Sequence, residues 1–146
     1  MRNHACRINI QVIYVSFYAC FKILVNKKEG KLVMSDINNL NGKFVEYDHL
    51  HSINMYFDDF GESYNLDMVL AKDLSDIYSE KIKIRFFNIT NLYLNDVGNR
   101  FTQFCSMYIE NNLDGWDGVK YNLNQLEDDR VLFKFFNFEL LEEYFL

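Results

Sequence analysis

The sequence predicts a mainly β fold, a single antiparallel-sheet domain of about six strands with at most one or two short helices; an α+β arrangement is the alternative. Several segments alternate between apolar and polar residues, which places the apolar side chains on one face of a strand. The segments between them are short and rich in Asp, Glu, Ser and Gly, which favours hairpins over helical crossovers. With 49% hydrophobic and 17% aromatic residues, this chain of 146 residues can bury one core.

The clearest strand spans residues 81–86, where apolar residues alternate with Lys81, Lys83 and Arg85. Residues 131–140 are apolar at nearly every position, which predicts one central strand, either covered on both faces or with its second face against a partner. Further alternating segments lie at residues 53–57, 66–70 and 119–123, and the connecting segments lie at residues 58–63, 73–79 and 126–130.

Two segments fit more than one conformation. Residues 99–111 fit a short helix or an extended segment, because their aromatic residues can share one helical face. Residues 138–146 fit a continued strand or one helical turn.

The first 33 residues differ from the rest of the chain in charge. Six basic residues against the single acid Glu29 give them a formal charge of +5, so the total of −6 leaves −11 for residues 34–146. Their apolar stretch, residues 8–25, is too short and too polar for a membrane span. Lys22 interrupts this stretch, and no small-residue cleavage site of a signal peptide follows it.

A start of translation at Met34 is the third interpretation of this leader. The codons of Lys28-Glu29-Gly30 can contain a bacterial ribosome-binding sequence at a workable distance from Met34. We therefore expect a basic apolar leader over residues 1–33, either untranslated, disordered or helical, and a single acidic β-rich domain over residues 34–146.

No motif for catalysis is present, whether nucleophile elbow, phosphate-binding loop, dinucleotide fingerprint or zinc motif. Cys6, Cys20 and Cys105 are odd in number and lack C-x-x-C spacing, so neither a disulfide framework nor a zinc site follows. Cys105 lies among apolar residues and is expected to be a small buried side chain rather than a nucleophile. Asp114 and Asp117 are flanked by glycines, which favours a tight connection over an acid/base pair. We expect no enzymatic activity and no cofactor.

One cluster has metal-ligand character. His49 and His51 are two residues apart, which places both side chains on the same face of a strand, and Asp48 is adjacent. Such a pair at the start of a strand is more often structural, and we assign no metal ligand. A metal-dependent enzyme is kept as an alternative that requires a third ligand, with the candidates Asp58, Asp59 and Glu62.

Three motifs follow one another along the chain: Tyr47-Asp48-His49-Leu50-His51-Ser52-Ile53, Ile84-Arg85-Phe86-Phe87-Asn88-Ile89-Thr90-Asn91-Leu92-Tyr93-Leu94 and Trp116-Asp117-Gly118-Val119-Lys120-Tyr121. Together they resemble small bacterial immunity proteins encoded beside polymorphic or contact-dependent toxins. The likeness spans most of residues 44–140, and residues 1–33 have no counterpart in it. The resemblance implies a β-rich protein without catalytic machinery that binds a toxin domain and blocks it.

The charge of the body agrees with this expectation, because an acidic protein associates rapidly with a basic toxin domain. It also disfavours nucleic acid as a partner, since a charge of −11 repels phosphate. We expect a cytoplasmic protein with a protein partner and no membrane association; a small binding or scaffold domain of unassigned ligand is the alternative. The expected contact residues are acids of two loops and nearby aromatics, namely Asp58, Asp59, Glu62, Glu127, Asp128, Asp129, Tyr56 and Tyr64.

Overall fold

The computed structural model describes residues 29–98, 100–113 and 118–144, and the chain divides into two units, Met1–Asp36 and Ile37–Leu146. Residues 1–28 of the expected leader, with Cys6 and Cys20, lie outside the described residues, and so do Asp114 and Asp117. No helix among the described residues is long and apolar enough to cross a membrane. All of the described strands belong to the unit Ile37–Leu146.

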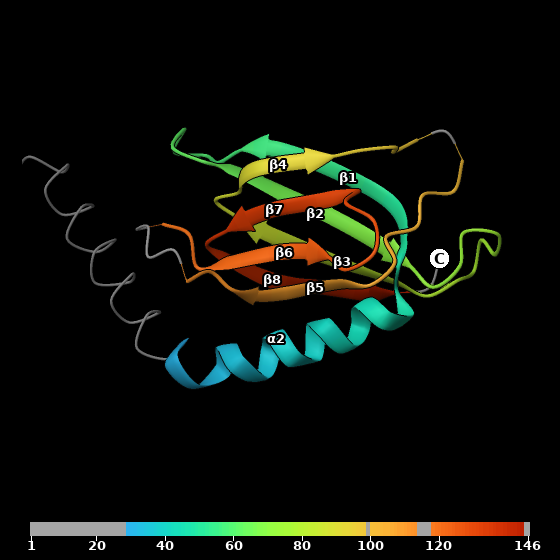
Figure 1. Ribbon diagram of the computed structural model, residues 1–146, viewed down its shortest axis with the longest axis horizontal. Coiled ribbons are helices and arrows are strands. Elements are labelled where there is room, and N and C mark those ends of the chain that lie inside the picture. Colours follow the sequence, from blue (N-terminus) through green and yellow to red (C-terminus); the bar gives the residue numbers. More distant parts are fainter. Residues whose placement is uncertain (1–28, 99, 114–117, 145–146) are drawn as a thin grey trace, which may run out of the picture. The chain divides into compact units, whose positions relative to one another are not determined.

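The described residues form two four-stranded antiparallel sheets, which confirms the predicted mainly β class with more strands than expected (Figure 1). The first sheet has the order β1-β2-β3-β8 and the second the order β4-β7-β6-β5. The strands are β1 (His49–Phe57), β2 (Tyr64–Ala71), β3 (Lys81–Phe87), β4 (Thr90–Leu94), β5 (Met107–Asn111), β6 (Tyr121–Gln125), β7 (Val131–Phe135) and β8 (Asn137–Tyr144).

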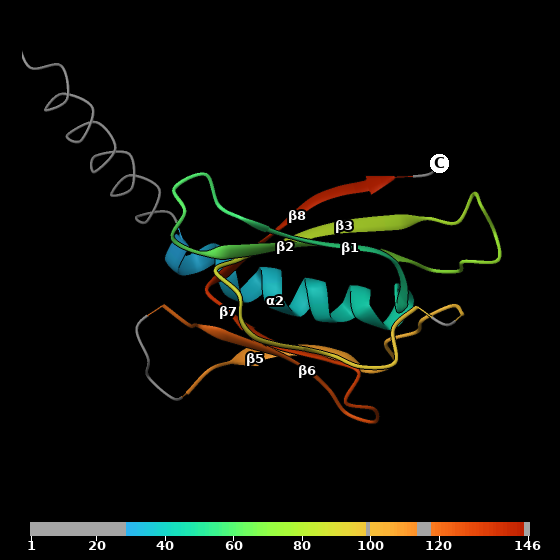
Figure 2. The same cartoon turned by 90° about the horizontal axis from the view of Figure 1, so that it is seen from above.

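The core lies between the two sheets, which face each other in Figure 2. Phe86 of β3 is fully buried, and its ring meets those of Phe133 and Phe135 of β7 edge to face, with centroids 4.9 and 5.0 Å apart. This geometry is the favourable one for aromatic pairs and adds about 0.5–1.5 kcal/mol per pair to the burial itself. The aromatic-rich composition is thus used to join one sheet to the other.

The prediction of one strand over residues 131–140 is wrong. The chain bends at Phe136, so that β7 is a central strand of the second sheet and β8 is an edge strand of the first. The inward residues of β7 alternate with less buried ones, while Phe138 of β8 lies opposite the buried Phe86. Continuous apolar character here reflects two strands that contribute to one core from opposite sides.

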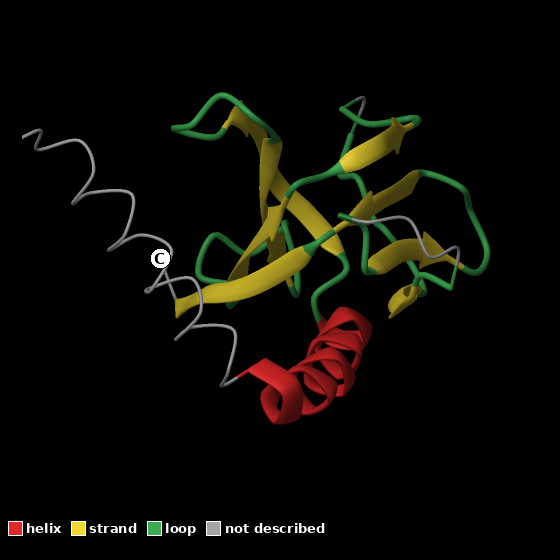
Figure 3. Cartoon of the chain, turned by 90° about the vertical axis from the view of Figure 1, so that its left-hand side faces the viewer, coloured by secondary structure: helices red, strands yellow, loops and turns green. Residues whose placement is uncertain are grey.

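Residues 107–111 settle part of the ambiguous segment 99–111, because they form β5 and not a helix. Helix α2 (Glu29–Glu46) was not predicted. Ile37, Leu40 and Phe44 are buried at the spacing i, i+3, i+7, which is the signal of one helical face. The helical segment from Ile37 onward runs along the side of the unit formed by β5 and β8, opposite β1 and β4 (Figures 1 and 3).

Asn41 of α2 completes the edge of the second sheet. Its side-chain nitrogen donates to the carbonyl of Ile109 at 3.0 Å, and its side-chain oxygen accepts from the Ile109 amide at 2.7 Å. An unpaired strand edge is a template for association with other chains. The Asn41 amide therefore takes the place of one residue of a neighbouring strand and protects β5.

The crossing from the first sheet to the second occurs at Asn88, which has φ of 52°. Asn tolerates this left-handed conformation better than other non-glycine residues. The backbone amide of Asn88 donates to Oδ1 of Asn65 at 3.2 Å, and the side-chain nitrogen of Asn88 donates to the Gly118 carbonyl at 3.3 Å. In the second sequence motif, Asn88 thus allows the chain to pass from β3 to β4, and Phe86 and Ile89 are buried in the core.

Substitution of Asn41 by Ala should lower the free energy of unfolding by about 1–3 kcal/mol, because it leaves two backbone groups of Ile109 without partners. Chemical denaturation of the full chain measures this loss. Asn39→Ala is the matched control on the exposed face of the same helix and should change stability by less than about 0.5 kcal/mol. Equal stability of the two variants would contradict the role of Asn41.

Candidate functional site

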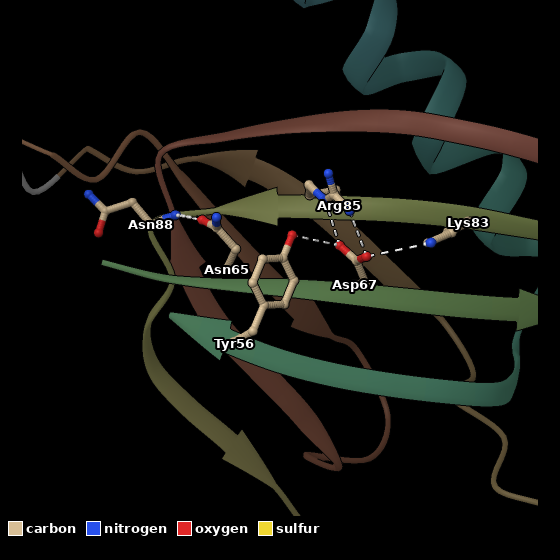
Figure 4. A network of polar contacts seen from close by, with 6 residues as sticks. All are labelled: Tyr56, Asn65, Asp67, Lys83, Arg85 and Asn88. Carbon is tan, nitrogen blue, oxygen red and sulfur yellow. Dashed lines mark hydrogen bonds and ion pairs between the residues drawn. The ribbon is translucent and has the colours of Figure 1, made fainter. Parts of the chain in front are cut away.

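The outer face of the first sheet carries a network of polar side chains centred on Asp67 (Figure 4). Arg85, directly opposite in β3, donates from Nε to Oδ1 of Asp67 at 2.7 Å and from a terminal nitrogen to Oδ2 at 2.9 Å. Lys83 lies 3.6 Å from the same carboxylate, and the Tyr56 hydroxyl donates to it at 3.3 Å. The network is satisfied internally, which is typical of a structural role.

These contacts change the ionisation of two groups. Hydrogen bonds from Arg85 hold the pKa of Asp67 below its ordinary value of 3.8, against an opposing effect of burial. Burial, followed by the charge of Asp67, raises the pKa of Tyr56 above 10.0. The three cations that alternate with apolar residues along residues 81–86 all have partners. Lys81 is buried and donates to the Ser79 carbonyl at 3.0 Å, while Lys83 and Arg85 pair with Asp67.

The histidine pair does not form a metal site with the other described residues, among which no group of three His, Cys, Asp or Glu side chains could hold an ion. A β-bulge between Leu50 and Ser52 places His51 outside the regular register. Nδ1 of His49 lies 2.7 Å from Oδ1 of Asp48, within ion-pair distance but without hydrogen-bond geometry. The candidate third ligands follow the far end of β1, and a strand of this length spans roughly 27–30 Å.

Asp48 instead joins β1 to a distant segment. Its carbonyl accepts from the Phe104 amide at 2.7 Å, and its Oδ2 accepts from the Gln103 side chain at 2.7 Å. The Leu50 amide donates to the Thr102 carbonyl at 2.8 Å. The first of the three sequence motifs therefore occupies a structural position as well.

The acids expected to contact a partner form two separate groups. Residues 58–62 lie in the turn between β1 and β2, and residues 127–129 lie in the turn between β6 and β7, at opposite ends of the unit (Figure 1). Asp58 organises its own turn, because its carboxylate accepts from the Glu62 amide at 2.9 Å and from the Ser63 hydroxyl at 2.7 Å. These bonds lower its pKa below 3.8. Asp59 and Glu62 remain exposed.

The second acidic group lies near Cys105. Burial raises the pKa of the Cys105 thiol above 9.0, and the charges of Asp48, Glu127 and Asp128 raise it further. A thiol of this kind stays protonated and is a poor nucleophile. Cys105 is half-buried in the structure rather than buried as expected.

Exposed apolar side chains gather on β1 and on the turn that follows it. Ile53 and Met55 lie opposite the fully buried Met68 and Leu66 of β2, and Phe57 follows on the same face of the strand, yet Met55 is 51% exposed and Phe57 50%. Phe60 is exposed as well, and the ring of Tyr64 lies 4.7 Å from that of Phe57. We refer to Ile53, Met55, Phe57, Phe60 and Tyr64 as the open edge.

On the opposite side of the same core, the corresponding side chains are covered, whereas those of the open edge are not. Met107 and Ile109 of β5 hold the equivalent inward positions on the side along which α2 runs, and they are only 4% and 3% exposed. Tyr56, which was expected among the contact residues, is half-buried in the Asp67 network, whereas Tyr64 belongs to the open edge. Sequence reasoning missed Met55 and Phe57 as surface residues, because their alternation predicts burial.

A cavity of about 410 Å³ continues the open edge toward the start of β1. Apolar side chains form most of its wall, and Arg100 and His51 add polar groups. Its lining residues come from β1, from the loop before β3 and from the loop between β4 and β5, namely Leu50, His51, Ser52, Ile53, Leu74, Val97, Gly98, Arg100, Phe101 and Thr102.

Comparison with known proteins found no matching family model, no matching curated protein and no matching solved structure.

The Asp67 network should make stability depend on acidity. A lowered carboxyl pKa stabilises the fold above the ordinary value of 3.8, and this contribution is lost as the pH falls below it. Asp67→Asn should therefore lower the free energy of unfolding at neutral pH by about 1–3 kcal/mol, toward the lower end because Lys83 and Arg85 are a third exposed. Denaturation curves between neutral pH and pH 3 should show the two proteins converging.

The exposed Asp59→Asn is the control for this experiment and should track the wild-type protein across the whole pH range. A constant difference between wild type and Asp67→Asn at every pH would contradict the role assigned to the Asp67 charge.

Proposed function

We propose that this chain acts by binding another protein through its open edge, and that the bound protein is a toxin which it neutralises, in the manner of an immunity protein. The observation that supports this function is the half-exposed state of Met55 and Phe57, which lie at positions facing the core. Apolar surface of this kind is costly in water and is typical of a surface that another protein covers. The resemblance of the three motifs names the class of that protein.

The charge of the unit favours a basic partner. Residues 37–146 contain nine Lys or Arg and nineteen Asp or Glu, a formal charge of −10. Long-range attraction would accelerate association with a cationic toxin domain. Asp59 and Glu62 stand beside the open edge, whereas Glu127, Asp128 and Asp129 lie at the other end of the unit.

The proposed function predicts rescue of growth. Co-expression of this chain with a toxic domain encoded next to it should restore the growth of bacterial cells that the domain otherwise stops. Phe57→Ser should weaken the complex by about 1–4 kcal/mol, roughly 5- to 1,000-fold in Kd, if the ring is an anchor. Leu126→Ser is the control, because Leu126 is 75% exposed and lies in the turn between β6 and β7. Absence of rescue by the wild-type chain would refute neutralisation.

Charge reversal distinguishes the two acidic groups. The double substitution Asp59→Lys and Glu62→Lys should slow association at low salt and make it less dependent on ionic strength. Glu127→Lys with Asp129→Lys makes the same change of charge at the other end of the unit and should have a smaller effect. Stopped-flow association with the purified toxin domain at several salt concentrations measures both, and equal effects would argue against the open edge.

A further inference from the structure

The four edge strands of the two sheets differ in how they are protected. Asn41 pairs with the backbone of β5, and β8 contains three glutamates in its sequence. The pairing of β4 is irregular between Thr90 and Tyr93, where Asn91 has φ of 53°. Residues 52–57 of β1 have neither a charge nor a proline and continue in regular register with β2. Of these edges, β1 is the one suited to accept another strand.

The hydrogen-bond pattern shows which groups of β1 point away from β2. The Asp58 amide donates to the Ser63 carbonyl, so Asp58 is paired within the hairpin, and pairing alternates along antiparallel strands. Phe57, Met55 and Ile53 are therefore the residues whose amide and carbonyl groups point outward. The N-terminal end of β1 gives the same assignment. The Leu50 amide points outward and bonds to Thr102, and the extra residue at the His51 bulge shifts the alternation by one, so that Ile53 is the next residue that points outward in the regular part of the strand.

A short part of this edge is already extended by the chain itself. His49 forms an isolated antiparallel bridge with Gln103, next to the bond between Leu50 and Thr102. Arg100 and Phe101, which precede Thr102, leave this edge and line the cavity instead. In the described part of the chain, no strand pairs with the outer side of β1 over residues 53–57. Residues 102–104 occupy the position of a further strand only beside residues 48–50.

We propose that an extended segment of the partner protein adds to this edge as a further antiparallel strand, with apolar side chains at alternate positions and Lys or Arg near its N-terminal end. Antiparallel pairing is the pattern of the whole sheet and the more stable one. It places the N-terminal end of the segment beside Asp59 and Glu62, where positive charge is favoured. The apolar side chains enter the space beside Met55 and Phe57, and the last of them meets the cavity. This proposal rests on the proposed function and specifies how the partner is held.

The test uses the full chain, labelled with ¹⁵N, and the peptide acetyl-Lys-Val-Lys-Val-Thr-Val-Thr-amide as probe. In the proposed pairing, the Val amides face β1 and the Lys and Thr amides face away. The peptide should slow hydrogen exchange at Ile53, Met55 and Phe57, and so should a peptide N-methylated at Lys and Thr. A peptide of the same side chains N-methylated at the Val amides should lose binding.

Equal binding by both methylated peptides, or chemical shift changes confined to residues 58–62, overturns strand addition. A protein whose mass doubles with concentration while the same amides become protected without peptide also overturns it, because the edge would then be filled by a second copy. Met55→Pro removes the outward amide and should abolish binding, whereas Met55→Ala should retain part of it. If Met55→Pro fails to fold, the comparison of peptides still decides, since it leaves the protein unchanged.

The outcome is independent of the growth assay. Rescue that depends on Phe57 together with a negative peptide experiment would leave neutralisation standing and reject strand addition. Loss of rescue together with peptide binding would reject neutralisation and leave the edge as a docking site for strands.

Discussion

The contact of Phe86 with Phe133 and Phe135 is the interaction on which the rest of this unit depends. Two four-stranded sheets are small, and neither can bury its apolar face without the other. The rings join β3, a central strand of the first sheet, to β7, a central strand of the second. Once the sheets face each other, two long sides of the core remain to be covered.

One helix covers one of these sides. Ile37, Leu40 and Phe44 are buried there, and Asn41 satisfies the backbone of the adjacent strand. The other side retains half-exposed residues in positions that point toward the core. If the open edge binds a partner as proposed, stability and recognition belong to different sides of the same core, so that a change on one side need not disturb the other.

The class of the fold could be predicted because alternation is a local property, and residues 81–86 carry it clearly. The division of residues 131–140 into two strands could not be predicted, because an apolar residue at each position is compatible with one strand covered on both faces and with two strands that share a core. Helix α2 had a usable signal in its three buried residues, but the change of charge at residue 33 lies inside this helix and suggests a boundary where the helix has none.

The candidate site was harder to predict than the fold, since exposure of Met55 and Phe57 depends on what covers them and not on their own type. The acids of residues 58–62 and 127–129 look equivalent in sequence, and only the topology separates them. The resemblance rests on motifs that include Asp48 and Asn88, and both residues have structural tasks at junctions of the chain.

The bulge at His51 gives the length of this strand a meaning of its own. Because side chains and hydrogen-bonding groups alternate with a period of two, one residue more or fewer between Leu50 and Ser52 exchanges the groups that bond to β2 with those that face outward. Loss of His51 would thus turn residues 48–50 over relative to residues 52–57, whose register is set at the hairpin, and would break the backbone bonds of Asp48 and Leu50 to residues 102–104.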